Sequence, residues 1–175
     1  RKEDIHWFYQ EGASRIFPEC WEDFVGHIPA NKRDNLLDAY YGILTGQDDV
    51  ARMSAAKAWS RWEAVCSTLD PCPQLVKRFT HPKMALSMAR IESHFFANDS
   101  FMETNAILKD AEKLKDIPGV IVHGRYDVVC PISNAYALKK VWPQAEFNII
   151  RDAGHAATEP GITDALIHAT KKLAR

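Results

Sequence analysis

The pattern of apolar and polar positions changes once along the chain, near residue 117. Up to that point apolar side chains recur every three to four residues with polar positions between them, which is typical of amphipathic helices. The pattern predicts helices at residues 3–11, 18–28, 34–44, 48–69, 74–79, 84–98 and 106–114. No strand pattern precedes Val120, so the sequence predicts a helical region over residues 1–117.

The remaining residues, 118–175, follow a different pattern, in which short apolar runs alternate with helical segments. The run at 120–122, before Gly124, and the run at 146–150 are typical of strands that are buried on both faces of a parallel sheet. Helices are predicted between them, at 134–142, and after them, at 162–173. The sequence therefore predicts two β-α units and an α/β fold class.

Two parallel strands rarely form a stable sheet alone, because parallel sheets are covered on both faces. We therefore expect this region to join strands that the sequence does not contain. The chain also begins with Arg1 rather than methionine, within a predicted helix. These features predict a piece of a longer protein, completed by an N-terminal core segment.

An acid and a histidine follow the two predicted strands. Asp127 comes directly after the first strand, and His155 follows the second. Polar groups at the carboxyl ends of parallel strands are candidates for a site, although a turn aspartate and a loop histidine are each common alone. In this order they match the last two members of the Ser-Asp-His triad of an α/β-hydrolase fold.

Several longer motifs resemble the proline iminopeptidase (prolyl aminopeptidase) family. They are HGRYDVVCP at 123–131, DAGHAATEPGI at 152–162, WFYQEGASRIFPECW at 7–21, WSRWE at 59–63 and ARIESHFF at 89–96. The resemblance implies an α/β-hydrolase fragment in which residues 1–117 form a helical cap and residues 118–175 form the last part of the core. It implies a serine aminopeptidase that releases N-terminal proline from peptides, with Asp127 as the catalytic acid and His155 as the base.

The same resemblance gives four residues of the helical region a role in binding substrate. Glu63 and Glu92 match glutamates that hold the free α-amino group, and Phe8 and Tyr9 match aromatic residues near the proline ring. Spacing alone favours a simpler interpretation of the glutamates, as solvated residues at the border of an apolar face. Phe8 and Tyr9 could equally be ordinary core aromatics.

The sequence departs from the family pattern in one large respect. It contains no G-x-S-x-G motif and no glycine-rich oxyanion loop before one. Ser14 does not supply the nucleophile, since it lacks both a preceding strand and the second glycine. We therefore expect two of the three triad members in this chain, and no turnover of prolyl substrates by these residues alone.

Composition excludes several other classes of protein. A net charge of −1 argues against a nucleic-acid binder, and no apolar run approaches the length of a membrane span. Four cysteines without a CxxC pair favour free thiols in a reducing, cytoplasmic compartment. The sequence has neither paired metal-ligand spacing nor a phosphate-binding loop, so it predicts no cofactor. Two alternatives stay open: another α/β-hydrolase, such as an esterase or epoxide hydrolase, and a non-catalytic helical binding module.

Overall fold

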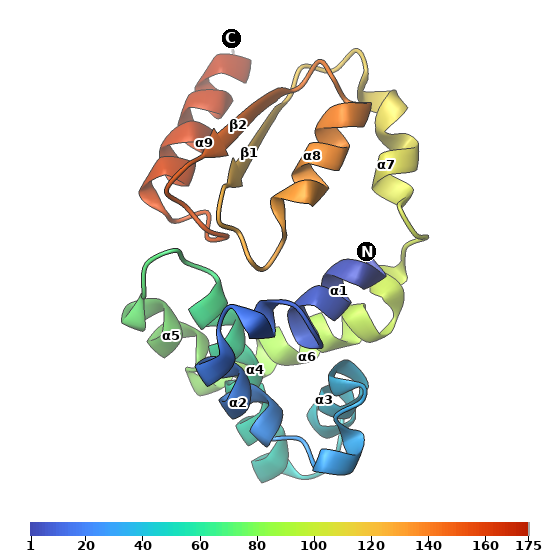
Figure 1. Cartoon of the computed structure of the whole chain (residues 1–175), viewed down its shortest axis with the longest axis vertical. Helices are drawn as coiled ribbons and strands as arrows, with labels where there is room; N and C mark the ends of the chain where they lie inside the picture. Colours follow the sequence, from blue (N-terminus) through green and yellow to red (C-terminus); the bar gives the residue numbers. More distant parts are fainter. Residues whose placement is uncertain (175) are drawn as a thin grey trace. The chain divides into compact units, whose positions relative to one another are not determined.

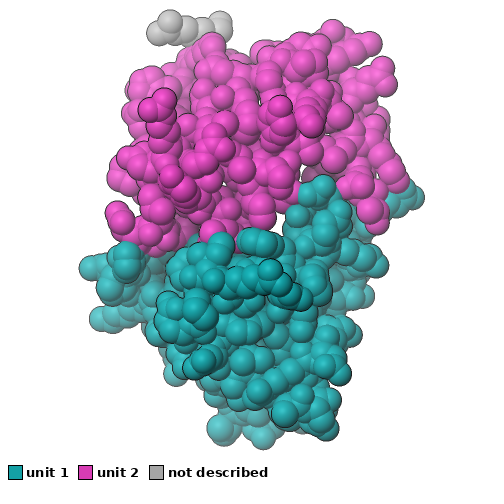
Figure 2. All heavy atoms as spheres, in the orientation of Figure 1, with its two compact units in different colours: residues 1–66, 71–103 teal, residues 67–70, 104–175 magenta. Residues whose placement is uncertain are grey.

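The computed structural model describes residues 1–174, which divide into two compact units (Figures 1 and 2). The helical unit comprises Arg1–Cys66 and Pro71–Glu103. The sheet unit comprises Ser67–Asp70 and the chain from Thr104 onward. This division differs from the predicted boundary at residues 117 and 118, which separates a cap from a core; that assignment stays a prediction.

The helical unit contains six α-helices, connected by short loops and single 3-10 turns. Their bounds are α1 Lys2–Tyr9, α2 Pro18–Gly26, α3 Leu36–Leu44, α4 Asp49–Cys66, α5 Pro73–Phe79 and α6 Pro82–Ala97. Prolines at the first turns of α2, α5 and α6 fix the backbone where no amide hydrogen is needed. The predicted helices are confirmed, although α4 ends at Cys66 rather than at Leu69.

Aromatic rings form the core of the helical unit. Trp59 and Trp62 lie on one face of α4 and are 0% and 1% exposed. The ring of Tyr9 from α1 stacks on Trp59 with centroids 4.2 Å apart, and Phe24 from α2 stacks on Tyr40 from α3 at 4.5 Å. These contacts join α1 to α4 and α2 to α3, and Phe24 also contacts Trp59, so the rings connect four helices of the unit.

The sheet unit is built on two parallel strands, β1 Val120–Gly124 and β2 Glu146–Ile150. Their register places Val120 opposite Glu146 and Gly124 opposite Ile150. The crossover helix α8 (Ile132–Val141) and the last helix α9 (Pro160–Leu173) flank the strands on opposite sides, while α7 (Ala106–Asp110) precedes them (Figure 1). The predicted β-α-β order is confirmed.

The strands are less buried than the sequence predicts. The residues Val120–His123 and Phe147–Ile150 are only half-buried, and Gly124 alone in β1 is buried. The physical reason is the width of the sheet, since only two strands pair within the described residues.

None of the helices in residues 1–174 is both long enough and apolar enough to cross a membrane.

Gly124 lets the ends of the two strands approach closely. A Cβ atom there would lie 1.9 Å from the Gly154 carbonyl oxygen and 2.6 Å from that of Ala153. We therefore expect Gly124→Ala to destabilise the sheet unit by about 2–4 kcal/mol, because backbone atoms must separate. Hydrogen exchange of the β1 amides in denaturant would measure this loss.

Gly42, in α3, provides the matched control. A Cβ atom at Gly42 would meet nothing within 4 Å. Gly42→Ala should leave β1 exchange unchanged and stabilise α3 by roughly 0.5–1 kcal/mol. Equal effects of the two substitutions on β1 would contradict the close approach at Gly124.

Candidate active site

Asp127 lies in the loop after β1, with its carboxylate held by the backbone of that loop. Its Oδ1 accepts hydrogen bonds from the amides of Val129 (3.0 Å) and Cys130 (2.8 Å). A side-chain oxygen that accepts from amides two and three residues later forms an Asx turn, a local arrangement that aspartate favours. Only 5% of the side chain is exposed, and the turn leaves Oδ2 to contact groups from other segments.

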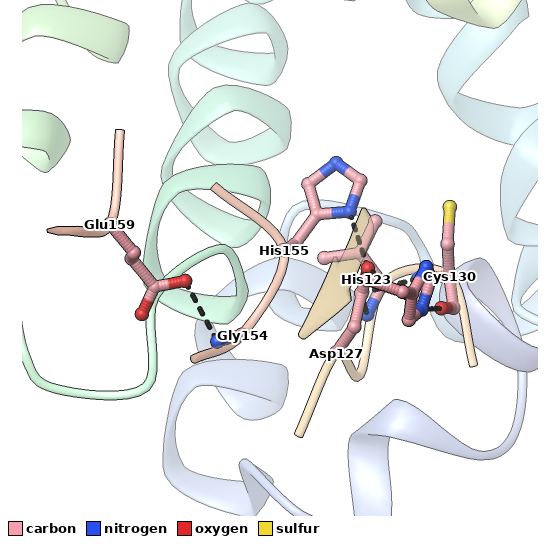
Figure 3. Close-up of polar contacts among 7 residues, drawn as sticks. His123, Asp127, Cys130, Gly154, His155 and Glu159 are labelled. Carbon is pink, nitrogen blue, oxygen red and sulfur yellow. Dashed lines mark hydrogen bonds and ion pairs between the residues drawn. The ribbon is translucent and has the colours of Figure 1, made fainter. Parts of the chain in front are cut away.

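His155 lies in the loop after β2 and meets this second oxygen. Its Nδ1 is 3.0 Å from Asp127 Oδ2, and its other ring nitrogen points away from the carboxylate (Figure 3). Because an ionised carboxylate only accepts, Nδ1 carries the proton of the bond and a neutral ring has its lone pair on Nε2. The pairing of β1 with β2 therefore brings together two residues that are 28 positions apart.

Backbone hydrogen bonds join the two loops directly. The amide of Arg125 donates to the Ile150 carbonyl at 2.8 Å, and that of Tyr126 donates to the Ala153 carbonyl at 3.0 Å. These bonds continue the parallel ladder past the strand ends. The Asp127–His155 contact is thus supported by the backbone as well as by the side chains.

The hydrogen bond with Asp127 raises the pKa of His155 from 6.5 to about 10, with Cys130 adding to the rise and burial opposing it. The negative carboxylate stabilises the charged imidazolium form of the ring, as the aspartate does in a catalytic triad. The side chain is 40% exposed, so surrounding water screens part of this interaction.

We expect an NMR titration of the His155 ring to give a pKa above 6.5 that returns toward 6.5 in Asp127→Asn. Asp152→Asn, which changes an exposed carboxylate of the His155 loop, serves as the control. Since the folded-state pKa is raised, the pair stabilises the fold fully below about pH 6.5 and loses this effect as pH rises through the raised pKa. An unchanged titration in Asp127→Asn would contradict the assigned bond.

Two residues beside the Asp127–His155 pair were not predicted from the sequence. His123 Nε2 lies 3.0 Å from the Cys130 carbonyl and 3.5 Å from Asp127 Oδ2, so it contacts the acid loop from β1. Glu159 accepts a hydrogen bond from the Gly154 amide, next to His155. Their positions in the motifs around Asp127 and His155 were the available signal, but local spacing did not show which atoms they bind.

The two predicted substrate-binding glutamates lie at one aromatic pair within the helical unit. Glu63, on α4, is 8% exposed and accepts a hydrogen bond from the Tyr9 hydroxyl. Glu92, on α6, is half-buried and accepts from Trp59 Nε1 at 2.8 Å. Because the rings of Tyr9 and Trp59 stack, both carboxylates border the same pair of rings. The interpretation of Glu63 as a solvated border residue is therefore wrong.

Phe8 and Tyr9 are both 3% exposed, but their surroundings differ. The Phe8 ring packs against Tyr9 and Trp62, and its carbonyl accepts from Trp62 Nε1 at 3.1 Å. Phe8 is thus a core residue of the helical unit. Tyr9 is also buried, but its hydroxyl reaches Glu63. A contact of either ring with a proline stays a prediction.

No group of three or more metal-ligating side chains occurs among the described residues, 1–174. Cys20, Cys66, Cys72 and Cys130 are free thiols. Burial raises the pKa of the Cys66 thiol far above its usual range, so this cysteine stays protonated and unreactive.

Comparison with known proteins gives a consistent set of relatives, although no protein-family model matches the chain. A proline iminopeptidase of Xylella fastidiosa is 47% identical over 97% of this chain and 55% of its own length. A probable proline iminopeptidase of Leptolyngbya boryana is 47% identical over 98% of this chain and 54% of its own. A proline iminopeptidase of Arabidopsis thaliana is 42% identical over 99% of this chain and 46% of its own length.

The chain thus spans about half the length of the curated relatives it matches. The matched region includes nearly all of both compact units, and with them the loops of Asp127 and His155 and the helices of Glu63 and Glu92. Over almost its entire length, the chain is similar to proline iminopeptidases.

Proposed function

We propose that the protein is a serine aminopeptidase that releases N-terminal proline from peptides, and that these residues form its helical cap and the last part of an α/β-hydrolase core. The observation that carries the proposal is the 3.0 Å contact between His155 Nδ1 and Asp127 Oδ2 at the ends of parallel strands. The names of the relatives support the choice of substrate.

In this mechanism His155 is the base and Asp127 holds its tautomer. His155 Nε2 accepts the proton of a serine hydroxyl as the serine oxygen bonds to the prolyl carbonyl carbon. The same nitrogen then returns that proton to the leaving amine, and water hydrolyses the prolyl ester. Asp127 stabilises the imidazolium that forms in both steps. The serine and the oxyanion donors would come from residues outside this sequence, which contains no G-x-S-x-G motif.

Glu63 and Glu92 supply the proposed specificity for a free N-terminus. Two carboxylates at one aromatic pair favour a protonated secondary amine and disfavour an acylated nitrogen, which has neither the charge nor a spare proton. The buried setting of Glu63 strengthens this preference, because a charge is held more strongly where water is excluded.

The proposal predicts a distinct set of substrates for the full-length protein. Proline β-naphthylamide should be hydrolysed, and N-acetyl-proline β-naphthylamide should not be. Residues 1–175 alone should give no turnover above a heat-killed control. If the acetylated substrate is hydrolysed as fast as the free one, an unspecific esterase or amidase would replace this proposal; if neither reacts, a binding module would replace it.

A further inference from the structure

The loop that carries His155 is anchored on a short segment from a distant part of the sequence, Ser67–Asp70, here called the strap. The strap follows α4 directly and precedes α5, but it packs with the sheet unit. The amides of His155 and Ala156 both donate to the Ser67 carbonyl, at 3.0 and 2.8 Å. The backbone of the base is therefore fixed from outside its own β-α unit.

Glu159 completes the connection between loop and strap. It precedes α9, and its Oε2 accepts from the Gly154 amide at 2.7 Å (Figure 3). Its Oε1 accepts from the Leu69 amide at 2.9 Å. One carboxylate thus bridges the residue before His155 and the middle of the strap, with a separate oxygen for each.

The contact leaves little room for adjustment. Gly154 is buried, and a Cβ atom on it would lie 3.1 Å from the Leu69 nitrogen and 3.3 Å from the Ser67 carbonyl oxygen. Ser67 is only 5% exposed. Water is therefore a poor substitute for the bonds that the Gly154 amide and the Ser67 carbonyl make here.

We propose that Glu159 is a positioning residue for His155, which holds the loop on the strap so that the imidazole stays on Asp127. This inference rests on the proposed function, in which His155 is the base. Both hydrogen bonds of Glu159 described above are to backbone amides and not to the imidazole ring. The groups that raise the pKa of His155 are Asp127 and Cys130. Glu159 therefore acts through the backbone of the loop and not through its charge.

The test compares Glu159→Gln, Glu159→Ala and the control Glu146→Gln in the full-length protein. Glutamine keeps one acceptor oxygen, alanine keeps none, and Glu146 is a carboxylate of the same unit that pairs with Lys172 at the surface. We expect kcat on proline β-naphthylamide to fall about tenfold in Glu159→Gln and about a hundredfold in Glu159→Ala, with KM unchanged. Glu146→Gln should match the wild type.

Two further readouts separate positioning from stability. In both Glu159 variants the Gly154 and Leu69 amides should exchange faster, and the pKa of His155 should move toward 6.5. A kcat within about twofold of the wild type together with an unchanged His155 titration would overturn the inference. If Glu159→Ala does not fold, Glu159→Gln decides alone. Full activity in Asp127→Asn would instead refute the proposed function, while amide exchange would still test the bridge.

Discussion

Asp127→Asn should lower kcat on proline β-naphthylamide by about 10⁴-fold in the full-length protein, with a small change in KM. The asparagine amide would present hydrogens to His155 Nδ1, so the ring would carry its proton on Nε2 instead. A protonated Nε2 cannot accept the hydroxyl proton of a serine. Because Asp127 Oδ1 accepts from the amides of Val129 and Cys130, the asparagine oxygen can keep those bonds and the loop should stay folded.

The matched control is Asp152→Asn, which removes an exposed carboxylate from the His155 loop. Its kcat should equal that of the wild type. Steady-state kinetics at several pH values would measure both variants, and wild-type activity should rise with pH as the His155 imidazolium loses its proton. A loss below about tenfold in Asp127→Asn would mean that the aspartate does not orient the base.

Glu63→Gln and Glu92→Gln should each lower kcat/KM for proline β-naphthylamide about a hundredfold while changing hydrolysis of a neutral ester little. Glutamine can still accept from the Tyr9 hydroxyl or from Trp59 Nε1, so packing around the aromatic pair is retained. What is lost is the negative charge that would hold the substrate's ammonium. The effect should therefore depend on the charge of the substrate.

Glu22→Gln is the control, because Glu22 is exposed on α2 of the same unit. It should leave both substrates unaffected. Equal losses on the amide and the ester in the Glu63 and Glu92 variants would show a general defect of the site. Full activity on both would remove the glutamates from the proposed mechanism and favour another α/β-hydrolase.

The elements that follow from local patterns could be predicted from the sequence. The apolar runs before Gly124 and at 146–150 gave both strands, and the parallel pairing of those strands explains why Asp127 and His155 meet. The end of α4 could not be predicted in this way. Leu69 continues the helical spacing, but the Ser67 carbonyl binds the amides of His155 and Ala156, more than 80 residues later.

The environment of the charged residues was equally hidden. Glu63 is buried because Tyr9, 54 positions earlier, donates its hydroxyl to it. Glu159 has an ordinary position before α9, and only the fold shows that its two oxygens bind Gly154 and Leu69. Such partners depend on contacts that are distant in sequence, so spacing alone favoured a solvated Glu63.

The proposed function depends most on one contact, between His155 Nδ1 and Asp127 Oδ2, which leaves His155 Nε2 as the proton acceptor. A crystal structure of the full-length protein with bound proline would test it directly. We predict a His155 Nδ1 to Asp127 Oδ2 distance of about 2.7–3.2 Å, and the proline carboxyl group on the Nε2 side of His155. A His155 ring turned from Asp127, or proline bound away from Nε2, would contradict the proposed mechanism.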